Sequence, residues 1–423
     1  MIPVHFGARL RARLRRAQHE GLVATIAGLL LSVAESMLWL VLLPLTAALH
    51  LAGYRRLPVL TQRIGHLAVE VDSFLKQRIL GELPHRKYFI TAPERRVSNP
   101  WLLRYWARHV PVVSHPLACF FLDAMSRWGL MRKDVREYLL RLDQTATAYR
   151  IAAAWGARPP ILDLTEEDQK WGRDVLRGLG VPDDGWFVAV HVREGGFSPA
   201  DEAVHRHRNA SLHAALPAMR RIVRRGGYCI RMGDSSMTPL PLEQGFIDYA
   251  HHAAKSARMD VYLCARTRFF LGNSSGLVFV SAAFGVPSAL ANSTPMSNFA
   301  LLARDLSIPK LLWSVPNSRF LRFDEVLDSP AGNFRHASLF DAAGLRLVEN
   351  SAEEIVALVE EMMDAMEGRS AYAPLDRSRQ RACRELLRPG HYSYGTCANI
   401  AASFLRAHRD LLPVESAATG QSA

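Results

Sequence analysis

The chain has 423 residues, a formal net charge of +12 and five cysteines. This length exceeds what a single hydrophobic core usually holds, so about two to three domains are expected. Apolar residues make up 49% of the chain and charged residues 22%, which is typical of a globular protein. The cysteines lie far apart and form no C-x-x-C pair, so neither a disulfide framework nor a zinc ribbon is indicated, and a reducing compartment fits best.

Positive charge is concentrated at the N-terminal end. Residues 1–110 carry an excess of ten positive charges. This basic region contains an apolar tract at residues 21–53, which is followed by Arg55 and Arg56 and preceded by five arginines: Arg9, Arg11, Arg13, Arg15 and Arg16. Such asymmetry suits a nucleic-acid binder or a protein at an anionic membrane, and the apolar tract favours the membrane. The second half also lacks the interleaved basic and aromatic residues of nucleic-acid binders.

The tract at residues 21–53 predicts an N-terminal membrane-associated helical segment. As one helix it would extend about 50 Å, which is too long for one upright span and too short for two. The flanking basic residues favour a hairpin with its turn or helix break at Glu35 and Ser36, or a long helix lying in the membrane interface. A single tilted span is the main alternative. A cleaved signal peptide is disfavoured because its apolar region has only about 7 to 15 residues.

The next part of the chain alternates short apolar runs with helical patterns. Residues 57–79 predict a strand, a glycine turn and a helix, residues 87–92 a strand, and residues 99–109 and 116–129 two helices. This alternation implies a parallel sheet covered on both faces. A break follows at residues 156–160. The helix expected next, at residues 164–180, has Thr165 as its N-cap and Asp168 at N3.

The second half repeats the alternation. Strands are expected at residues 187–192, 228–234, 268–274 and 288–292, and helices at residues 209–227, 261–267, 276–285, 351–368 and 399–411. The fold class is therefore α/β, a pair of Rossmann-like domains behind the membrane segment. The expected division is residues 1–56 for the basic N-terminus and membrane segment, 57–160 and 161–370 for the two domains, 371–412 for a C-terminal helical segment, and 413–423 for a disordered tail.

Three of the expected strands in the second domain end in glycine and polar residues. They are His191, Arg193, Glu194 and Gly195 at the end of the first strand, Arg231, Gly233, Asp234 and Ser235 at the end of the second, and Asn273, Ser274, Ser275 and Gly276 at the end of the third. Ligands of parallel sheets bind at the carboxyl ends of the strands, where glycine lets them approach the backbone. The third loop also opens a helix, whose first N–H groups favour an anion.

This pattern predicts a pocket for a nucleotide diphosphate, with the planar guanidinium of Arg193 directed at a phosphate. Each loop alone also has a purely structural explanation. A strand-end arginine is often part of an ion pair, and Asp234 could cap the turn that holds Ser236. The occurrence of three such loops in one domain favours a ligand site.

Several other chemistries lack their motifs. Neither G-x-G-x-x-G nor G-x-x-x-x-G-K-[ST] is present, so a dinucleotide oxidoreductase and a P-loop NTPase are disfavoured. No Asp-x-Asp pair is available to hold a metal against a nucleotide diphosphate. Metal binding is disfavoured for the histidines, which have mixed spacing and no cysteine nearby: His205, His207, His213, His251 and His252. No metal or other cofactor is therefore expected to be obligatory.

A resemblance to a known family is carried by VHVREGGF, RNASLHAALPAMRRIVRRGGYCIRMGDSSMTPLP, DYAHHAAKSARMDVYLCARTRFFLGNSSGL and AAFGVPSALANSTP. These segments resemble a family of bacterial glycosyltransferases associated with surface carbohydrate synthesis. Their order is also similar to that in fucosyltransferase-like enzymes, which have a His-x-Arg strand end, a strand ending in Asp and Ser, and a serine-rich loop. Glu194 departs from this second pattern, where another basic residue is usual, so the sugar need not be fucose.

The resemblance implies a GT-B arrangement, with the acceptor bound by residues 57–160 and a nucleotide sugar by residues 161–370. Arg193 would stabilise the departing nucleoside diphosphate, and His191 would support its loop. Asp201 or Glu202 would take the proton of the acceptor. The other strand-end residues named above would line the donor.

The basic residues of the first domain would orient it toward an acceptor at the membrane. Arg63 and His66 lie in its first loop and are the expected acceptor-side residues.

Together these features predict a membrane-associated, metal-independent and inverting glycosyltransferase. It would act on a lipid-linked or surface-glycan acceptor at the cytoplasmic face of a bacterial inner membrane, where nucleotide sugars are available. The expected partners are the nucleotide sugar, the acceptor and the anionic membrane, and no nucleic acid. The alternative is a binding or assembly protein at the membrane that keeps the fold but has no activity.

Overall fold

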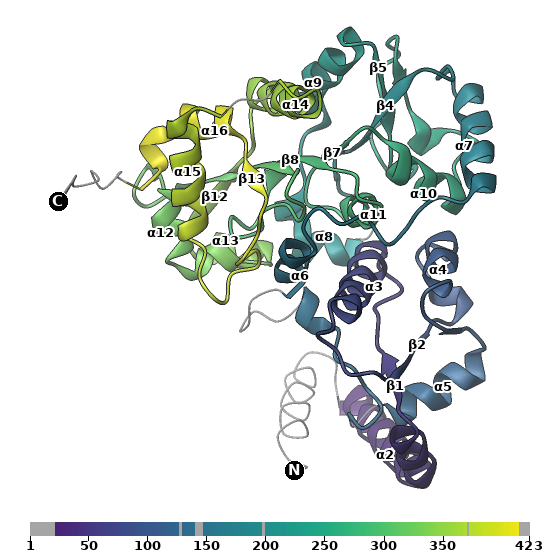
Figure 1. Ribbon diagram of the computed structural model, residues 1–423. Coiled ribbons are helices and arrows are strands. Elements are labelled where there is room, and N and C mark those ends of the chain that lie inside the picture. Colours follow the sequence, from purple (N-terminus) through teal and green to yellow (C-terminus); the bar gives the residue numbers. More distant parts are fainter. Residues whose placement is uncertain (1–21, 127–128, 140–146, 197–198, 370–371, 414–423) are drawn as a thin grey trace, which may run out of the picture. The chain divides into compact units, whose positions relative to one another are not determined.

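A computed structural model describes residues 22–126, 129–139, 147–196, 199–369 and 372–413 (Figure 1). The chain divides into two compact units. The smaller unit consists of the residues up to Pro58 together with His85–Arg96 and Val110–Asp134, and the larger unit contains the rest. Residues 57–160, expected to form one acceptor-side domain, therefore contribute to both units, and the domain boundaries stay a prediction.

The smaller unit has a parallel sheet in the order β1-β2-β3. Its strands are β1 (Tyr54–Leu57), β2 (Lys87–Thr91) and β3 (Val112–Val113), and its helices are α2 (Leu22–Leu51) and α5 (Pro116–Met125). Phe89, Met125 and Met131 form a buried apolar cluster, and Leu42 and Leu49 of α2 pack against it. One side of α2 is thus part of the hydrophobic core of this unit.

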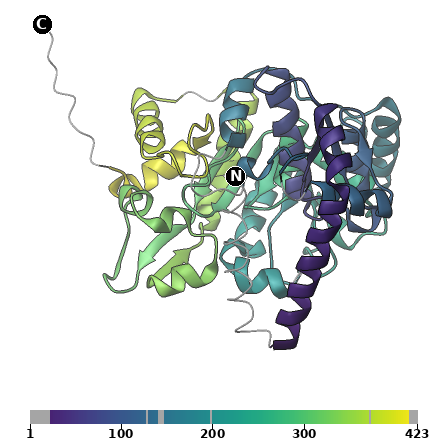
Figure 2. The same ribbon diagram turned by 90° about the horizontal axis from the view of Figure 1, so that it is seen from below.

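Helix α2 is continuous from Leu22 to Leu51 (Figure 2), so the hairpin turn expected at Glu35 and Ser36 is wrong. Neither residue is glycine or proline, and the surrounding leucines and alanines are strong helix formers, so nothing in the local sequence ends the helix there. Pro44 lies inside the helix without ending it. Within the described parts of the chain, no helix combines the length and the hydropathy needed to cross a membrane.

The larger unit is built on a seven-stranded sheet in the order β13-β9-β8-β7-β4-β5-β6. Its strands are β4 (Trp186–His191), β5 (Gly227–Arg231), β6 (Phe246–Ile247), β7 (Phe270–Gly272), β8 (Ser288–Ser293), β9 (Leu306–Pro309) and β13 (Asn399–Ile400). All neighbouring strands are parallel. The expected α/β class with a parallel sheet is confirmed.

Figure 1 labels the helices of the larger unit. They are α3 (Ile64–Ile79), α4 (Pro100–Ala107), α6 (Thr147–Trp155), α7 (Glu166–Gly178), α8 (Pro199–His205), α9 (Leu212–Arg224), α10 (Ala257–Arg266), α11 (Leu277–Ala283), α12 (Phe323–Leu327), α13 (Ala337–Ala342), α14 (Ala352–Met366), α15 (Pro374–Glu385) and α16 (Ala402–Ala407). A small antiparallel sheet has the order β11-β10-β12, with β10 (Leu311–Ser314), β11 (Arg319–Phe320) and β12 (Leu345–Val348). The elements expected at residues 87–129 and 187–292 are confirmed, whereas β9 to β13 were not expected.

Asp168 joins three helices of the larger unit. As predicted, the Thr165 hydroxyl accepts a hydrogen bond from the Asp168 N–H at the start of α7, at 3.1 Å. The buried Asp168 carboxylate accepts hydrogen bonds from Trp101 Nε1 of α4 at 3.1 Å and from Arg258 Nε of α10 at 2.6 Å. These bonds hold α4 in the same unit as the large sheet, across the boundary expected at residues 156–160.

Helix α3 packs against α11 through two glycines (Figure 1). The strand and glycine turn expected at the start of residues 57–79 are wrong, because β1 ends at Leu57 and Gly65 lies inside the first turn of α3. A Cβ atom on Gly65 would lie 2.8 Å from the Cα of Gly276, and one on Gly276 would lie 2.9 Å from the nitrogen of Gly65. Both positions therefore need glycine because the two backbones touch.

We expect Gly65→Ala to lower the free energy of unfolding by about 1–3 kcal/mol, because its methyl group would overlap the backbone of Gly276. Gly178→Ala is the control, since a Cβ at this last residue of α7 meets nothing within 4 Å. The control should be neutral or stabilising by up to about 1 kcal/mol. Urea unfolding of both variants measures the difference. A Gly65→Ala variant as stable as the unmodified protein would contradict the close contact.

Candidate functional site

The three polar loops leave the large sheet next to one another, as predicted. Strand β4 lies between β5 and β7, and Val190 pairs with Arg231 while His191 pairs with Gly272. The chain runs from β4 outward to β5 and β6 and then returns to place β7 on the other side of β4. This reversal is the position at which open parallel sheets bind their ligands.

The loops after β4 and β7 are tied together by hydrogen bonds. The backbone N–H of Arg193 donates to Asn273 Oδ1 at 3.0 Å. Asn273 Nδ2 in turn donates to the carbonyl oxygen of Arg208 at 2.9 Å, and Arg208 Nε donates to the carbonyl oxygen of Ser274 at 2.9 Å. Asn273 is buried, so its amide sets the spacing of the two loops.

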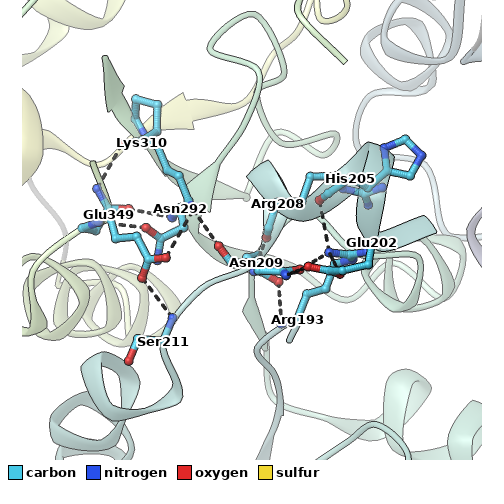
Figure 3. Close-up of polar contacts among 12 residues, drawn as sticks. Arg193, Glu202, His205, Arg208, Asn209, Ser211, Asn292, Lys310 and Glu349 are labelled. Atoms are coloured by element: carbon cyan, nitrogen blue, oxygen red, sulfur yellow. Dashed lines mark hydrogen bonds and ion pairs between the residues drawn. The ribbon is translucent and has the colours of Figure 1, made fainter. Parts of the chain in front are cut away.

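The guanidinium of Arg193 lies among polar groups that follow its own strand (Figure 3). Its Nη1 donates to the carbonyl oxygen of His205 at 3.2 Å and to Asn209 Oδ1, and it lies 3.8 Å from a carboxylate oxygen of Glu202. Glu202 also accepts a hydrogen bond from Asn209 Nδ2. The structure thus places Glu202, one of the two expected bases, beside the cation. Asp201 belongs to α8, and its side chain lies outside the described residues.

Arg231 is fully buried and does not line an open surface. Its Nη2 donates to Glu194 Oε2 at 3.1 Å, and the same carboxylate oxygen accepts a hydrogen bond from the N–H of Thr238 at 2.8 Å. Burial lowers the pKa of Arg231, and the charge of Glu194 opposes this shift. Glu194, the departure from the fucosyltransferase pattern, is therefore the partner of a buried cation and joins the loops after β4 and β5.

The other predicted residues of these two loops differ in their surroundings. Asp234 Oδ1 accepts a hydrogen bond from the Ser236 N–H at 2.9 Å, so it caps its turn. Ser235 is exposed. Gly233 has φ +144°, in the region that favours glycine, and a Cβ on Gly195 would lie 3.2 Å from Cδ of Glu202.

Several buried polar atoms at this edge of the sheet have no hydrogen-bond partner among the described residues. They include His191 Nδ1 at the end of β4, Nε and Nη1 of Arg231 at the end of β5, Ser275 Oγ after β7, and Ser293 Oγ and Thr294 Oγ1 at the end of β8. Burial and then the charge of Arg231 lower the pKa of His191 to about 3, so its imidazole is neutral near pH 7. Because buried polar atoms nearly always have partners, a polar ligand or ordered water is expected to contact them.

A second polar group adjoins Arg193 and was missed by the sequence reasoning (Figure 3). Lys310 follows β9, and its Nζ donates to the carbonyl oxygen of Asn209 at 2.6 Å and lies 3.4 Å from Glu349 Oε1. Glu349 also accepts a hydrogen bond from the N–H of Ser211 at 2.9 Å. The strand-end position of Lys310 is the signal that could have identified it, but β9 itself was not predicted.

The two acceptor-side residues lie at the start of α3, in the same compact unit as the three loops. Arg63 is the exposed N-cap residue of α3, and its side chain does not cap the helix. His66 Nδ1 lies 2.8 Å from Glu70 Oε1. The contact between Gly65 and Gly276 brings this turn of α3 against the loop after β7.

The histidines in the loop before α9 contact other rings. His205 and His207 have ring centroids 6.0 Å apart, and His207 lies 5.6 Å from the ring of Phe340. In the regions that the structure describes, no group of three or more His, Cys, Asp or Glu side chains is arranged to hold a metal ion.

No family model matches the chain, and no curated protein matches it. Among solved structures, a family 9 glycosyltransferase from Veillonella parvula is similar, with a TM-score of 0.33, 14% identity and coverage of 69% of this chain and 78% of the other. The ADP-heptose LPS heptosyltransferase II of E. coli has a TM-score of 0.39 and 14% identity, over 60% and 90% of the two chains. The iron-containing heptosyltransferase TibC has a TM-score of 0.34 and 10% identity, over 85% and 76%. These scores are too low to transfer residue roles to this chain.

We expect Glu194→Ala to lower the free energy of unfolding by about 3–5 kcal/mol, because it leaves the buried charge of Arg231 without its carboxylate. Glu243→Ala is the control. It removes the carboxylate of an exposed pair with Arg220 and should leave the free energy of unfolding almost unchanged, because water screens such a pair. Urea unfolding measures both. Equal free energies of unfolding for the two variants would contradict the role of Glu194 as the partner of buried Arg231.

Proposed function

We propose that the protein is a glycosyltransferase that takes its sugar from a nucleotide diphosphate, bound at the carboxyl ends of β4, β5 and β7. The observation that carries this proposal is the group of buried polar atoms without partners at His191, Ser275 and Thr294. They lie at the strand-reversal edge of the sheet, and the adjoining loops contain the cations Arg193 and Arg208. Hydroxyl groups, an imidazole and guanidinium groups are suitable donors for a diphosphate.

Sugar transfer is supported by the motif resemblance over these same loops. In the proposed reaction the acceptor oxygen attacks the anomeric carbon from the side opposite the diphosphate, which gives inversion. The bond from the anomeric carbon to the phosphate oxygen breaks, and its electron pair leaves with the nucleoside diphosphate. Arg193 stabilises this developing charge, and its loop is already fixed by Asn273 before the ligand binds. We propose that arginine provides this stabilisation without an obligatory metal.

We expect Arg193→Lys and Arg193→Ala both to lose turnover by on the order of 10² to 10³, because lysine lacks the planar donor geometry. Release of nucleoside diphosphate from UDP-, GDP-, ADP- and dTDP-linked sugars measures this turnover, and activity should persist in EDTA. Arg220→Lys is the control, because Arg220 is part of an exposed ion pair on α9.

Near-normal turnover of Arg193→Lys would contradict the role of Arg193. Complete loss in EDTA, restored by magnesium or manganese, would contradict the metal-free reaction. The second candidate function is a binding or assembly protein, and it is supported if the folded protein binds a nucleoside diphosphate but releases none from any donor.

We further propose that the smaller unit binds an anionic membrane through α2 and α5. Leu42 and Leu49 face the core, while large apolar side chains of the two helices are exposed: Met37, Leu40, Val41, Leu45, Leu51, Leu117, Phe120 and Phe121. The exposed cations Arg86 and Lys87 lie in the same unit, where Lys87 pairs with Tyr54 just after α2. Exposed apolar helix faces near cations suit a helix lying in the membrane interface. This arrangement retains the proposed location at the cytoplasmic face of a bacterial inner membrane, beside a lipid-linked or surface-glycan acceptor.

We expect Val41→Asp and Phe120→Asp to reduce flotation with vesicles that contain phosphatidylglycerol. These side chains are 76% and 57% exposed, and a carboxylate on either would oppose insertion of the apolar face. Val315→Asp is the control, because Val315 is 58% exposed but belongs to the larger unit. Equal flotation of all three variants would contradict the proposed membrane face.

A further inference from the structure

His66 and Glu70 form a hydrogen-bonded pair on one side of α3. The Glu70 carboxylate is buried, and its two oxygens have different partners: Oε1 contacts His66 Nδ1 at 2.8 Å, and Oε2 accepts a hydrogen bond from the Leu60 N–H at 3.0 Å. An ionised carboxylate only accepts, so Nδ1 of the neutral imidazole carries the proton and Nε2 carries the lone pair. The pair therefore sets the tautomer in which Nε2 accepts a proton.

The turn of α3 that carries His66 lies against the loop after β7. Gly65, the residue before His66, touches the backbone of Gly276, and Gly276 directly follows Ser275, whose buried hydroxyl has no partner among the described residues. The His66 side chain is 17% exposed, whereas Glu70 is almost completely covered. Within the part of the chain that the structure describes, the contact with Glu70 is the one hydrogen bond of the His66 ring, and it uses Nδ1. Nε2 is thus the ring atom that can accept a proton from a ligand.

The carboxylate of Glu202 is less suited to this task. It accepts a hydrogen bond from Asn209 and lies 3.8 Å from the guanidinium of Arg193, so it is positioned to hold that cation.

We infer that His66 is the general base of the proposed sugar transfer and that Glu70 positions it, an inference that rests on the proposed function. Nε2 of His66 takes the proton from the acceptor hydroxyl as its oxygen forms the bond to the anomeric carbon. The electron pair of the breaking glycosyl–phosphate bond leaves with the nucleoside diphosphate. The Glu70 carboxylate stabilises the imidazolium that forms, without itself taking the proton.

Donor hydrolysis tests this role without a known acceptor, because water that attacks the sugar must also lose a proton. The probe is the UDP-, GDP-, ADP- or dTDP-linked sugar that the unmodified protein hydrolyses fastest. His66→Ala should lower kcat by about 10² to 10⁴ with unchanged donor affinity in calorimetry, and added imidazole should restore part of the turnover. His213→Gln, a change at an exposed histidine of α9, is the control and should be unaffected.

Glu70→Gln tests the positioning role. A glutamine can keep both hydrogen bonds if its amide donates to Nδ1, but this moves the ring proton to Nε2 and removes the base. We expect kcat to fall by at least about tenfold, with KM and the thermal midpoint unchanged. A structural role alone would change the midpoint and leave kcat of the folded protein intact.

The outcomes separate this inference from the function on which it rests. Hydrolysis by the unmodified protein together with near-normal kcat in His66→Ala overturns the base role and leaves the glycosyltransferase proposal in place. A loss in His66→Ala that imidazole does not restore, accompanied by weaker donor binding, also overturns it, because His66 would then serve binding. Absence of turnover with every donor in the folded, unmodified protein overturns the proposed function and the base role together.

Discussion

The contact between Gly65 and Gly276 is the constraint on which the candidate site depends. Side chains at these two positions would hold α3 away from the loop after β7. With glycine at both, the first turn of α3 lies against that loop, and His66 comes within one residue of the contact. Residues far apart in the sequence thereby share one compact unit, which contains both the proposed base and the proposed diphosphate site.

The cations around this edge of the sheet already have protein partners. Arg193 is held by Asn209 and Glu202, Arg231 by Glu194, and Lys310 by Glu349. Such pairing fixes the loops before a ligand arrives, which is the condition for electrostatic stabilisation without reorganisation. The two arginines differ in their burial. Arg231 is fully buried and stabilises a loop, whereas Arg193 is partly exposed and can still contact a charged ligand.

The sequence predicted those elements whose local signals agree with their tertiary environment. Apolar runs ending in glycine identified β4, β5 and β7, and Thr165 identified the start of α7. In β9, Ser307 and Pro309 interrupt the apolar run, and β13 has only two residues, so neither strand shows a pattern and Lys310 was missed with β9. The sequence pattern also could not show that Gly65 allows close packing between two helices, because its partner Gly276 is distant in the sequence. For the same reason it could not show that Arg231 is buried beside Glu194. The hairpin failed because length and charge favoured a turn that Glu35 and Ser36 do not provide.

Strand β13 has a consequence for the biogenesis of the protein. Asn399 and Ile400 pair with Leu306 and Ser307, so β13 completes this edge of the large sheet although it follows β9 only after a long stretch of chain. On a ribosome, β9 can pair with β8 long before its other neighbour emerges. Its free edge is meanwhile available to other strands, including those of neighbouring nascent chains. Protection of this edge of β9 therefore depends on a segment that is synthesised much later than β9 itself.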